Sequence, residues 1–137
     1  MHIRDVMTPN PRTVSPDDSI QNAARIMRDC DTGAVPVVDN GRPVGIVTDR
    51  DIVVRTVAEG RDPNRAMLGE ICSRHLVHVA PDDPIERAID LMREYAVRRL
   101  PVVHNGAPIG ILSLGDLASY RDPESPLAVI SEAPGNL

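Results

Sequence analysis

The sequence of 137 residues contains no lysine, phenylalanine or tryptophan. Its 15 basic residues are therefore all arginines, and 20 acidic residues outnumber them, which gives a net charge of −5. Proteins that bind nucleic acid through its phosphates normally carry the opposite charge, and single-strand and RNA binders also need aromatic side chains for stacking. Because two tyrosines are the only aromatic residues, binding to nucleic acid is disfavoured.

Cysteines and long apolar runs are equally scarce. Cys30 and Cys72 do not stand in a spacing typical of a zinc or redox motif, which favours a reducing compartment. No apolar run approaches the length of a membrane-spanning helix, and the N-terminal residues lack the apolar stretch of a secretory signal. We therefore expect a cytoplasmic protein without a membrane partner.

Residues that could form a metal centre or a catalytic site are also few. His75 and His78 lie close together, but no cysteine, aspartate or third histidine completes a zinc-binding pattern. Neither cysteine has the flanking context of a nucleophile, and the sequence shows no set of acid, base and nucleophile. We expect neither a bound metal nor an enzyme.

What the chain does contain is an internal repeat with an offset of 65 residues. Ser15–Ile52 aligns with Ala80–Leu117 without a gap, and 16 of the 38 aligned pairs are identical. The chain is too short for two independently stable domains, so the repeats should pack on each other and share a core. The predicted organisation is repeat 1 at residues 1–60, a connection at 61–70, repeat 2 at 71–120 and a C-terminal tail at 121–137.

The first helix of each repeat is predicted from apolar residues at helical spacing, over 17–30 and 82–95. Capping signals mark the two predicted helix starts, and they are Asp18 with Gln21 in the first copy and Asp83 with Pro84 and Glu86 in the second.

A β-hairpin is predicted after each of these helices. β-Branched runs at 34–39 and 99–104 lead into Asn-Gly turns, and second strands follow at 43–48 and 108–113. Helices should follow both hairpins, and the apolar run Leu127–Ile130 of the tail should dock as a helical turn.

The end of each hairpin carries a hydroxyl residue followed three positions later by a carboxylate. Thr48 with Asp51 and Ser113 with Asp116 fit helix N-caps and capping boxes, although the usual capping-box partner is Glu or Gln. Alternatively, the hydroxyl and the free N–H groups would hold a phosphate while the carboxylate accepts hydrogen bonds from ribose. The motif leaves both interpretations open.

Taken in order, these motifs resemble the CBS domain, named after cystathionine β-synthase, in the tandem pair called a Bateman module. The resemblance covers about Val6 to Leu117, through "VMTPNPRTVSPDDSI", the "PVV" strands, and "GIVTDRD" and "GILSLGD". The stretch "TDRDIVVRTVAEGRDPN" is also similar to free-standing two-CBS proteins of the hypoxic-response type. The resemblance implies an α/β (α+β) fold of two β-α-β-β-α repeats about a pseudo-twofold axis. It also implies a non-enzymatic sensor that binds an adenosine-containing ligand in the cleft between the repeats.

The resemblance further implies which residues contact that ligand. Asp51 and Asp116 would contact ribose, and Thr48 and Ser113 would lie beside the phosphate. Hydrophobic residues would line the base with side chains or backbone, and these are Val14, Val35, Pro36, Val79, Leu100 and Pro101.

Arginines distinguish the two copies. Arg98 and Arg99 match positions where members of the family carry basic residues that touch phosphate, whereas the first copy has Gly33 and Ala34 there. The alternative for both is a surface or interface ion pair with the acidic excess. Arg50 could compensate in the first copy, or its side chain could simply be solvated. One anion site is therefore predicted more firmly than two.

The expected ligands are AMP, ADP, ATP or S-adenosylmethionine, and no cofactor is expected to be obligatory. The resemblance implies a homodimer that regulates another, unidentified protein. The alternative is a ligand-free interaction or scaffold protein that acts through dimerisation, in which the junction residues are caps only.

Overall fold

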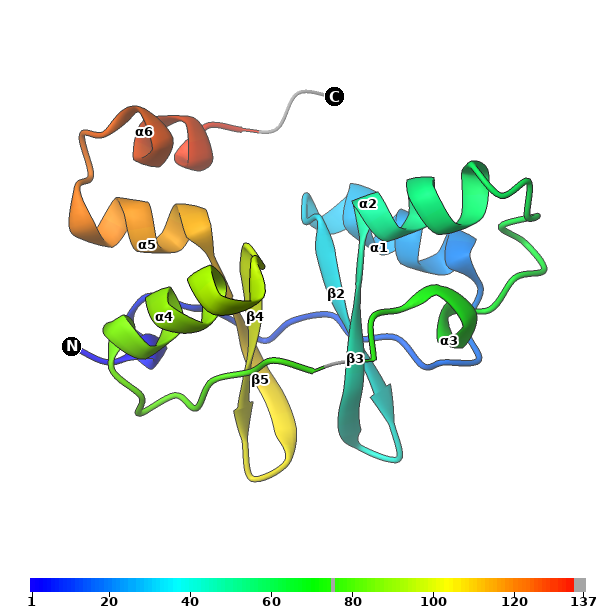
Figure 1. Ribbon diagram of the computed structural model, residues 1–137, viewed down its shortest axis with the longest axis horizontal. Coiled ribbons are helices and arrows are strands. Elements are labelled where there is room, and N and C mark those ends of the chain that lie inside the picture. Colours follow the sequence, from blue (N-terminus) through cyan, green and yellow to red (C-terminus); the bar gives the residue numbers. More distant parts are fainter. Residues whose placement is uncertain (75, 135–137) are drawn as a thin grey trace. The chain divides into compact units, whose positions relative to one another are not determined.

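The computed structural model describes residues 1–74 and 76–134 and divides the chain into two compact units (Figure 1). Pro11–Leu76 form the first-repeat unit, and Met1–Asn10 together with Val77–Leu137 form the second-repeat unit. Each unit consists of a β-hairpin with helices packed against it, so the predicted α+β fold of two repeats is confirmed. Within the described residues, no helix combines the length and the apolar character needed to cross a bilayer.

The first-repeat unit is built around one antiparallel hairpin and a helix that buries its apolar side. Its elements are α1 (Ile20–Cys30), β2 (Ala34–Asp39), β3 (Arg42–Thr48), α2 (Asp49–Ile52), the π-helical turn η2 (Val53–Val57) and α3 (Leu68–Ile71). Ile20, Ala23, Ile26 and Met27 of α1 recur at helical spacing and are buried in the same core as Val35 of β2.

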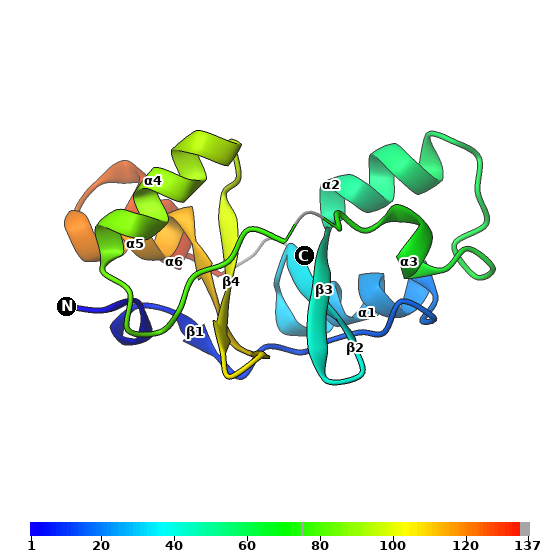
Figure 2. The same cartoon turned by 60° about the horizontal axis from the view of Figure 1, so that its bottom comes forward.

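The second-repeat unit repeats this plan and adds elements from both ends of the chain. Its elements are η1 (Ile3–Asp5), β1 (Thr8–Pro9), α4 (Ile85–Tyr95), β4 (Arg99–His104), β5 (Ala107–Ser113), α5 (Leu114–Arg121) and α6 (Pro126–Glu132). The strands form one sheet in the order β1-β5-β4, which can be followed in Figure 2. Ile3 at the start of the chain is completely buried in this unit's core.

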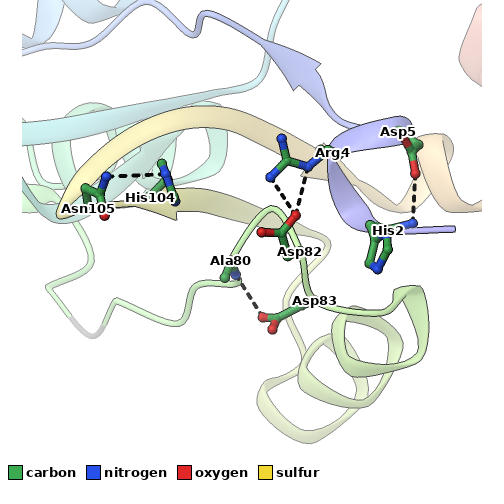
Figure 3. A network of polar contacts seen from close by, with 8 residues as sticks. All are labelled: His2, Arg4, Asp5, Ala80, Asp82, Asp83, His104 and Asn105. Carbon is green, nitrogen blue, oxygen red and sulfur yellow. Dashed lines mark hydrogen bonds and ion pairs between the residues drawn. The ribbon is translucent and has the colours of Figure 1, made fainter.

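The residues predicted to cap the first helix of each repeat are wrong. The hydroxyl of Ser19, not a carboxylate, caps α1 and accepts from the Asn22 N–H at 3.1 Å. In the second copy Pro84 occupies the N-cap position, so no side chain caps α4. Asp18 accepts instead from the Ser15 N–H at 2.8 Å, and Asp83 accepts from the Ala80 N–H at the same distance (Figure 3). The carboxylates thus close the turn that precedes each helix, through local bonds to the backbone that compete with helix capping.

Both predicted hairpins are confirmed, with the strands joined by Asn-Gly turns. Asn40 and Gly41 have φ angles of +53° and +78°, and Asn105 and Gly106 have +51° and +77°. Two consecutive positive φ angles are the requirement of a type I′ turn, whose twist matches that of the flanking strands. The turn therefore sets the same register in both hairpins.

Pro36 lies inside β2 without removing a hydrogen bond from the hairpin. The Pro36 carbonyl accepts from the Val14 N–H at 3.1 Å, on the side of the strand that faces away from β3. The missing N–H of Pro36 lies on that same outer side, where proline is tolerated. Pro101 has the same arrangement in β4, where its carbonyl accepts from Val79 at 3.1 Å.

Segments that precede each sequence repeat join the hairpin of the other repeat. Thr8 pairs with Ile111 of β5, and Ser73 pairs with Ile46 of β3. Since Thr8 and Ser73 are also 65 residues apart, the structural repeat begins earlier than the aligned region. This exchange is why the compact units divide at residues 10/11 and 76/77, whereas the predicted boundaries follow the sequence repeat.

The repeated glycines of "GIVT" and "GILS" make room for these exchanged segments. A Cβ at Gly45 would lie 2.4 Å from the Ser73 carbonyl oxygen. A Cβ at Gly110 would lie 2.4 Å from the Met7 Sδ and 3.1 Å from the Thr8 carbonyl oxygen. Close approach of another segment, and not a turn, therefore accounts for both glycines: it is the Ser73 backbone at Gly45, and the Met7 side chain together with the Thr8 carbonyl at Gly110.

The tail docks as a helix on the second-repeat unit, as predicted for Leu127–Ile130. The hydroxyl of Ser125 caps α6 by accepting from the Ala128 N–H at 3.2 Å, and Ala128 is completely buried. The helix α6 packs on α5 where Gly115 faces Ser131, since a Cβ at Gly115 would lie 2.6 Å from the Ser131 Oγ.

Candidate functional site

Capping boxes form at both strand-to-helix junctions. The Thr48 Oγ1 accepts from the Asp51 N–H at 3.1 Å, and an Asp51 carboxylate oxygen accepts from the Thr48 N–H at 2.9 Å. Ser113 and Asp116 make the same pair of bonds at 3.0 and 2.9 Å. The capping interpretation of the repeated motif is therefore confirmed in both copies.

The caps engage only one oxygen of each carboxylate. In both junctions it is Oδ2 that accepts the backbone bond. The Oδ1 of Asp51, a residue only 8% exposed, faces the Arg55 guanidinium at 3.6 Å. The Oδ1 of Asp116 has no hydrogen-bond or ion-pair partner within residues 1–74 and 76–134, and the Asp116 side chain is half-buried. A second acceptor therefore stays available at the Ser113–Asp116 junction.

Arg98 and Arg99 lie at this same junction. Arg99 is the pairing partner of Ser113 between β4 and β5, and the Arg98 carbonyl accepts from the Leu114 N–H at 2.9 Å. Neither guanidinium forms an ion pair with an acidic residue of the described chain. The surface ion pair considered from the sequence is thus not seen there, and two arginines remain next to Ser113 and Asp116.

The corresponding positions of the first copy carry no charge. Ala34 pairs with Thr48, and the Gly33 carbonyl accepts from the Asp49 N–H at 3.0 Å. Arg50 is exposed, and its side chain makes no ion pair with the residues that the structure describes. The two junctions therefore share their backbone geometry but differ in the basic groups around it.

The residues expected around the base are mostly parts of the hydrophobic cores. Val35 and Leu100 are completely buried, and Val14 and Val79 are 4% and 1% exposed. Their side chains pack within their own units, so a base could reach them chiefly through backbone atoms. Pro36 and Pro101 are buried as well, next to Val14 and Val79.

Arg55 was not predicted as a site residue. It follows Asp51 by four positions, which places it over the Asp51 side chain one helical turn later. The i, i+4 spacing of the two residues is the sequence signal for this contact. The hydrogen bonds of Arg55 to Ile71 and Ser73 could not be predicted from local spacing, because their partners lie 16 and 18 positions along the chain.

Metal ligands are not gathered in the described part of the chain, where no three His, Cys, Asp or Glu side chains could hold one ion together. Of the pair His75 and His78, His75 lies outside the described residues. Burial raises the pKa of the Cys72 thiol, which keeps that thiol protonated and unreactive near neutral pH.

Comparison with known proteins finds one family model, described as CBS domain, that matches residues 3–56 and 68–122. This chain belongs to the CBS domain family. The two matches coincide with the two repeats, so the chain contains a tandem CBS pair, as the resemblance implied. Among curated relatives, the CBS domain-containing protein YhcV of Bacillus subtilis is 44% identical over 116 residues, which cover 85% of this chain and 82% of the relative.

Solved structures of CBS pairs share this fold. Hypoxic Response Protein I, crystallised with two coordinated zinc ions, is 35% identical with a TM-score of 0.80, covering 88% of this chain and 98% of that protein. The CBS domain pair of protein MJ0100, in complex with 5′-methylthioadenosine and S-adenosyl-L-methionine, is 26% identical with a TM-score of 0.81. That match covers 91% of this chain and 98% of the solved chain of the MJ0100 domain pair.

Proposed function

We propose that this CBS pair is a non-enzymatic regulatory module that binds an adenosine-containing nucleotide or metabolite through its Thr48–Asp51 and Ser113–Asp116 junctions. The MJ0100 pair supports the ligand class, since it is complexed with two adenosine derivatives. The observation that carries the proposal is the Ser113–Asp116 junction itself. There the cap leaves Asp116 Oδ1 without a partner in the described chain, and Arg98 and Arg99, which lack acidic partners there, lie at the start of the strand that pairs with Ser113.

The chemistry of the junction suits the sugar and an anionic group of such a ligand. A carboxylate oxygen that is not used by the backbone can accept from a ribose hydroxyl, and a hydrogen bond to a charged acceptor is stronger than a neutral one. Arginine binds phosphate or carboxylate through its planar fork of donors. AMP, ADP, ATP and S-adenosylmethionine all combine ribose with such an anionic group.

Replacing Asp by Asn at the junctions separates the cap from the ligand-binding role. In Asp51→Asn and Asp116→Asn the amide oxygen can still accept the capping bond, while the second carboxylate acceptor becomes a donor. We expect the double variant to melt within a few degrees of the wild type. We also expect it to bind AMP, ATP or S-adenosylmethionine at least tenfold more weakly by calorimetry, the effect of losing about one hydrogen bond to a charged group. Equal affinity in wild type and double variant would contradict the proposal.

A second candidate function, a ligand-free scaffold that acts through self-association, is favoured by exposed apolar residues. Val53, Val54 and Val57 of the first-repeat unit and Leu127, Val129 and Ile130 of α6 are large apolar side chains that remain exposed in the isolated chain. Both candidates include a homodimer, and sedimentation velocity with and without AMP, ATP and S-adenosylmethionine separates them. A regulatory module changes its sedimentation or its dimer dissociation constant with ligand, whereas a scaffold stays the same.

A further inference from the structure

Arg55 is held in place by three groups of the first-repeat unit. Its NH1 lies 3.6 Å from the Asp51 Oδ1, donates to the Ile71 carbonyl at 2.8 Å and lies 3.4 Å from the Ser73 Oγ. The Asp51 side chain is 11% exposed, so the attraction between the two charges is screened less than in a surface pair. These contacts hold Arg55 next to Asp51. Moving its side chain away would also break the hydrogen bond to the Ile71 carbonyl.

The second copy has no equivalent of this contact. The residue four positions after Asp116 is Tyr120, which is 39% exposed and carries no charge at neutral pH. Both oxygens of Asp51 are thus engaged, Oδ2 by the cap and Oδ1 by the guanidinium, whereas at Asp116 only Oδ2 has a partner in the described chain. A ribose hydroxyl would have to compete with a cation at Asp51 but not at Asp116.

We propose that Arg55 is an internal competitor for Asp51 and makes the two junctions unequal binding sites for the same adenosine-containing ligand. The inference rests on the proposed function. Ser113–Asp116 becomes the strong site, where Arg98 and Arg99 add attraction for an anionic group. Thr48–Asp51 becomes the weak site, because its acceptor is occupied and Gly33 and Ala34 supply no compensating charge. Arg55 acts through Asp51 and is a positioning residue, not a ligand contact.

Exchanging positions 55 and 120 tests this inference in both directions. Arg55→Tyr gives the first junction the residue of the second, and Tyr120→Arg gives the second junction the residue of the first. Calorimetric titrations use AMP, which carries a phosphate, and 5′-methylthioadenosine, which has ribose but no anionic group. In the wild type we expect one strong and one weak site per chain.

The two substitutions should change the ligand affinities of the two sites in opposite directions. We expect Arg55→Tyr to strengthen the weak site about tenfold for both ligands, the size of one hydrogen bond to a charged group. Tyr120→Arg should weaken the strong site by a similar factor. The control Arg65→Tyr makes the same change of charge at a side chain that is 89% exposed, and it should leave both sites unchanged.

Loss of affinity in Arg55→Tyr would show that Arg55 contacts the ligand and would overturn the inference, as would two equal sites in the wild type. Both results leave the proposed function standing. If neither ligand binds to the wild type or to any variant, the proposed function fails and the inference fails with it. Tyr120→Arg leaves the bonds to Ile71 and Ser73 intact, so it keeps the test decisive even if Arg55→Tyr does not fold.

Discussion

The two repeats of this chain keep the same hairpin register and the same capping box, yet differ in what surrounds them. In the first copy the junction carboxylate is buried beside Arg55, and the neighbouring strand begins with Ala34, preceded by Gly33. In the second copy the carboxylate is half-buried, and the neighbouring strand begins with Arg99, which pairs with Ser113 and is preceded by Arg98. The shared backbone geometry preserves the fold in both copies, whereas function depends on the side chains at each site, and these differ.

The difference extends to the segments that pack against the hairpins. Gly45 approaches the backbone of Ser73, whereas Gly110 approaches mainly the flexible side chain of Met7. The helix α6 covers α5 in the second-repeat unit, where Gly115 admits Ser131, and the aligned position in the first copy is Arg50. The same fold is thus completed by different partners in the two units.

The largest expected difference between the copies concerns the repeated glycines. Gly45→Ala should lower the free energy of unfolding by about 2–3 kcal/mol, because the new Cβ meets a carbonyl oxygen of a paired strand. Gly110→Ala should cost about 1 kcal/mol, because a methionine side chain can rotate away. Urea denaturation measures both, and equal losses would mean that the two segments are equally rigid.

A smaller effect is expected where α6 meets α5. Gly115→Ala should loosen α6, because the added Cβ would lie 2.6 Å from the Ser131 Oγ, while the gain in helix propensity of about 1 kcal/mol offsets much of the loss in global stability. Hydrogen exchange should accelerate at residues 126–132. Unchanged exchange in Gly115→Ala would show that this contact does not hold α6 in place.

The smallest effect concerns Cys72, which takes the place in the first-repeat unit that Met7 takes in the second. Burial raises the pKa of this thiol above its ordinary value of 9.0, the Arg74 guanidinium lowers it by less, and the Asp51 carboxylate makes a still smaller contribution that raises it. The unfolded chain therefore loses the thiol proton first, so the stability from this group is complete below pH 9.0 and declines as the pH rises through the folded-state pKa. In Cys72→Met the free energy of unfolding should fall less steeply as the pH rises above 9.0. Urea denaturation under reducing conditions measures this slope. Identical alkaline slopes in both proteins would exclude this origin.

Local sequence signals predicted most helices and strands of each repeat and the capping boxes of the candidate site. Helical periodicity predicted α1 and α4, and Asn-Gly between β-branched runs predicted both hairpins. The spacing of Thr48 and Asp51 predicted the capping box, because a cap depends only on residues three positions apart. The caps of α1 and α4 were predicted wrongly, because the backbone N–H groups of Ser15 and Ala80 bind the carboxylates of Asp18 and Asp83 instead.

Only the tertiary structure decided which distant parts of the chain pair with each other. The exchange of Thr8 and Ser73 between the two hairpins, the need for Gly45 and Gly110, and the anchoring of Arg55 on Ile71 all depend on such pairings. Turns, caps and periodic helices result from short-range sterics and hydrogen bonds that a sequence window contains. The segment that pairs with an exposed strand edge is selected by contacts between residues far apart in the sequence. No local sequence window contains that information.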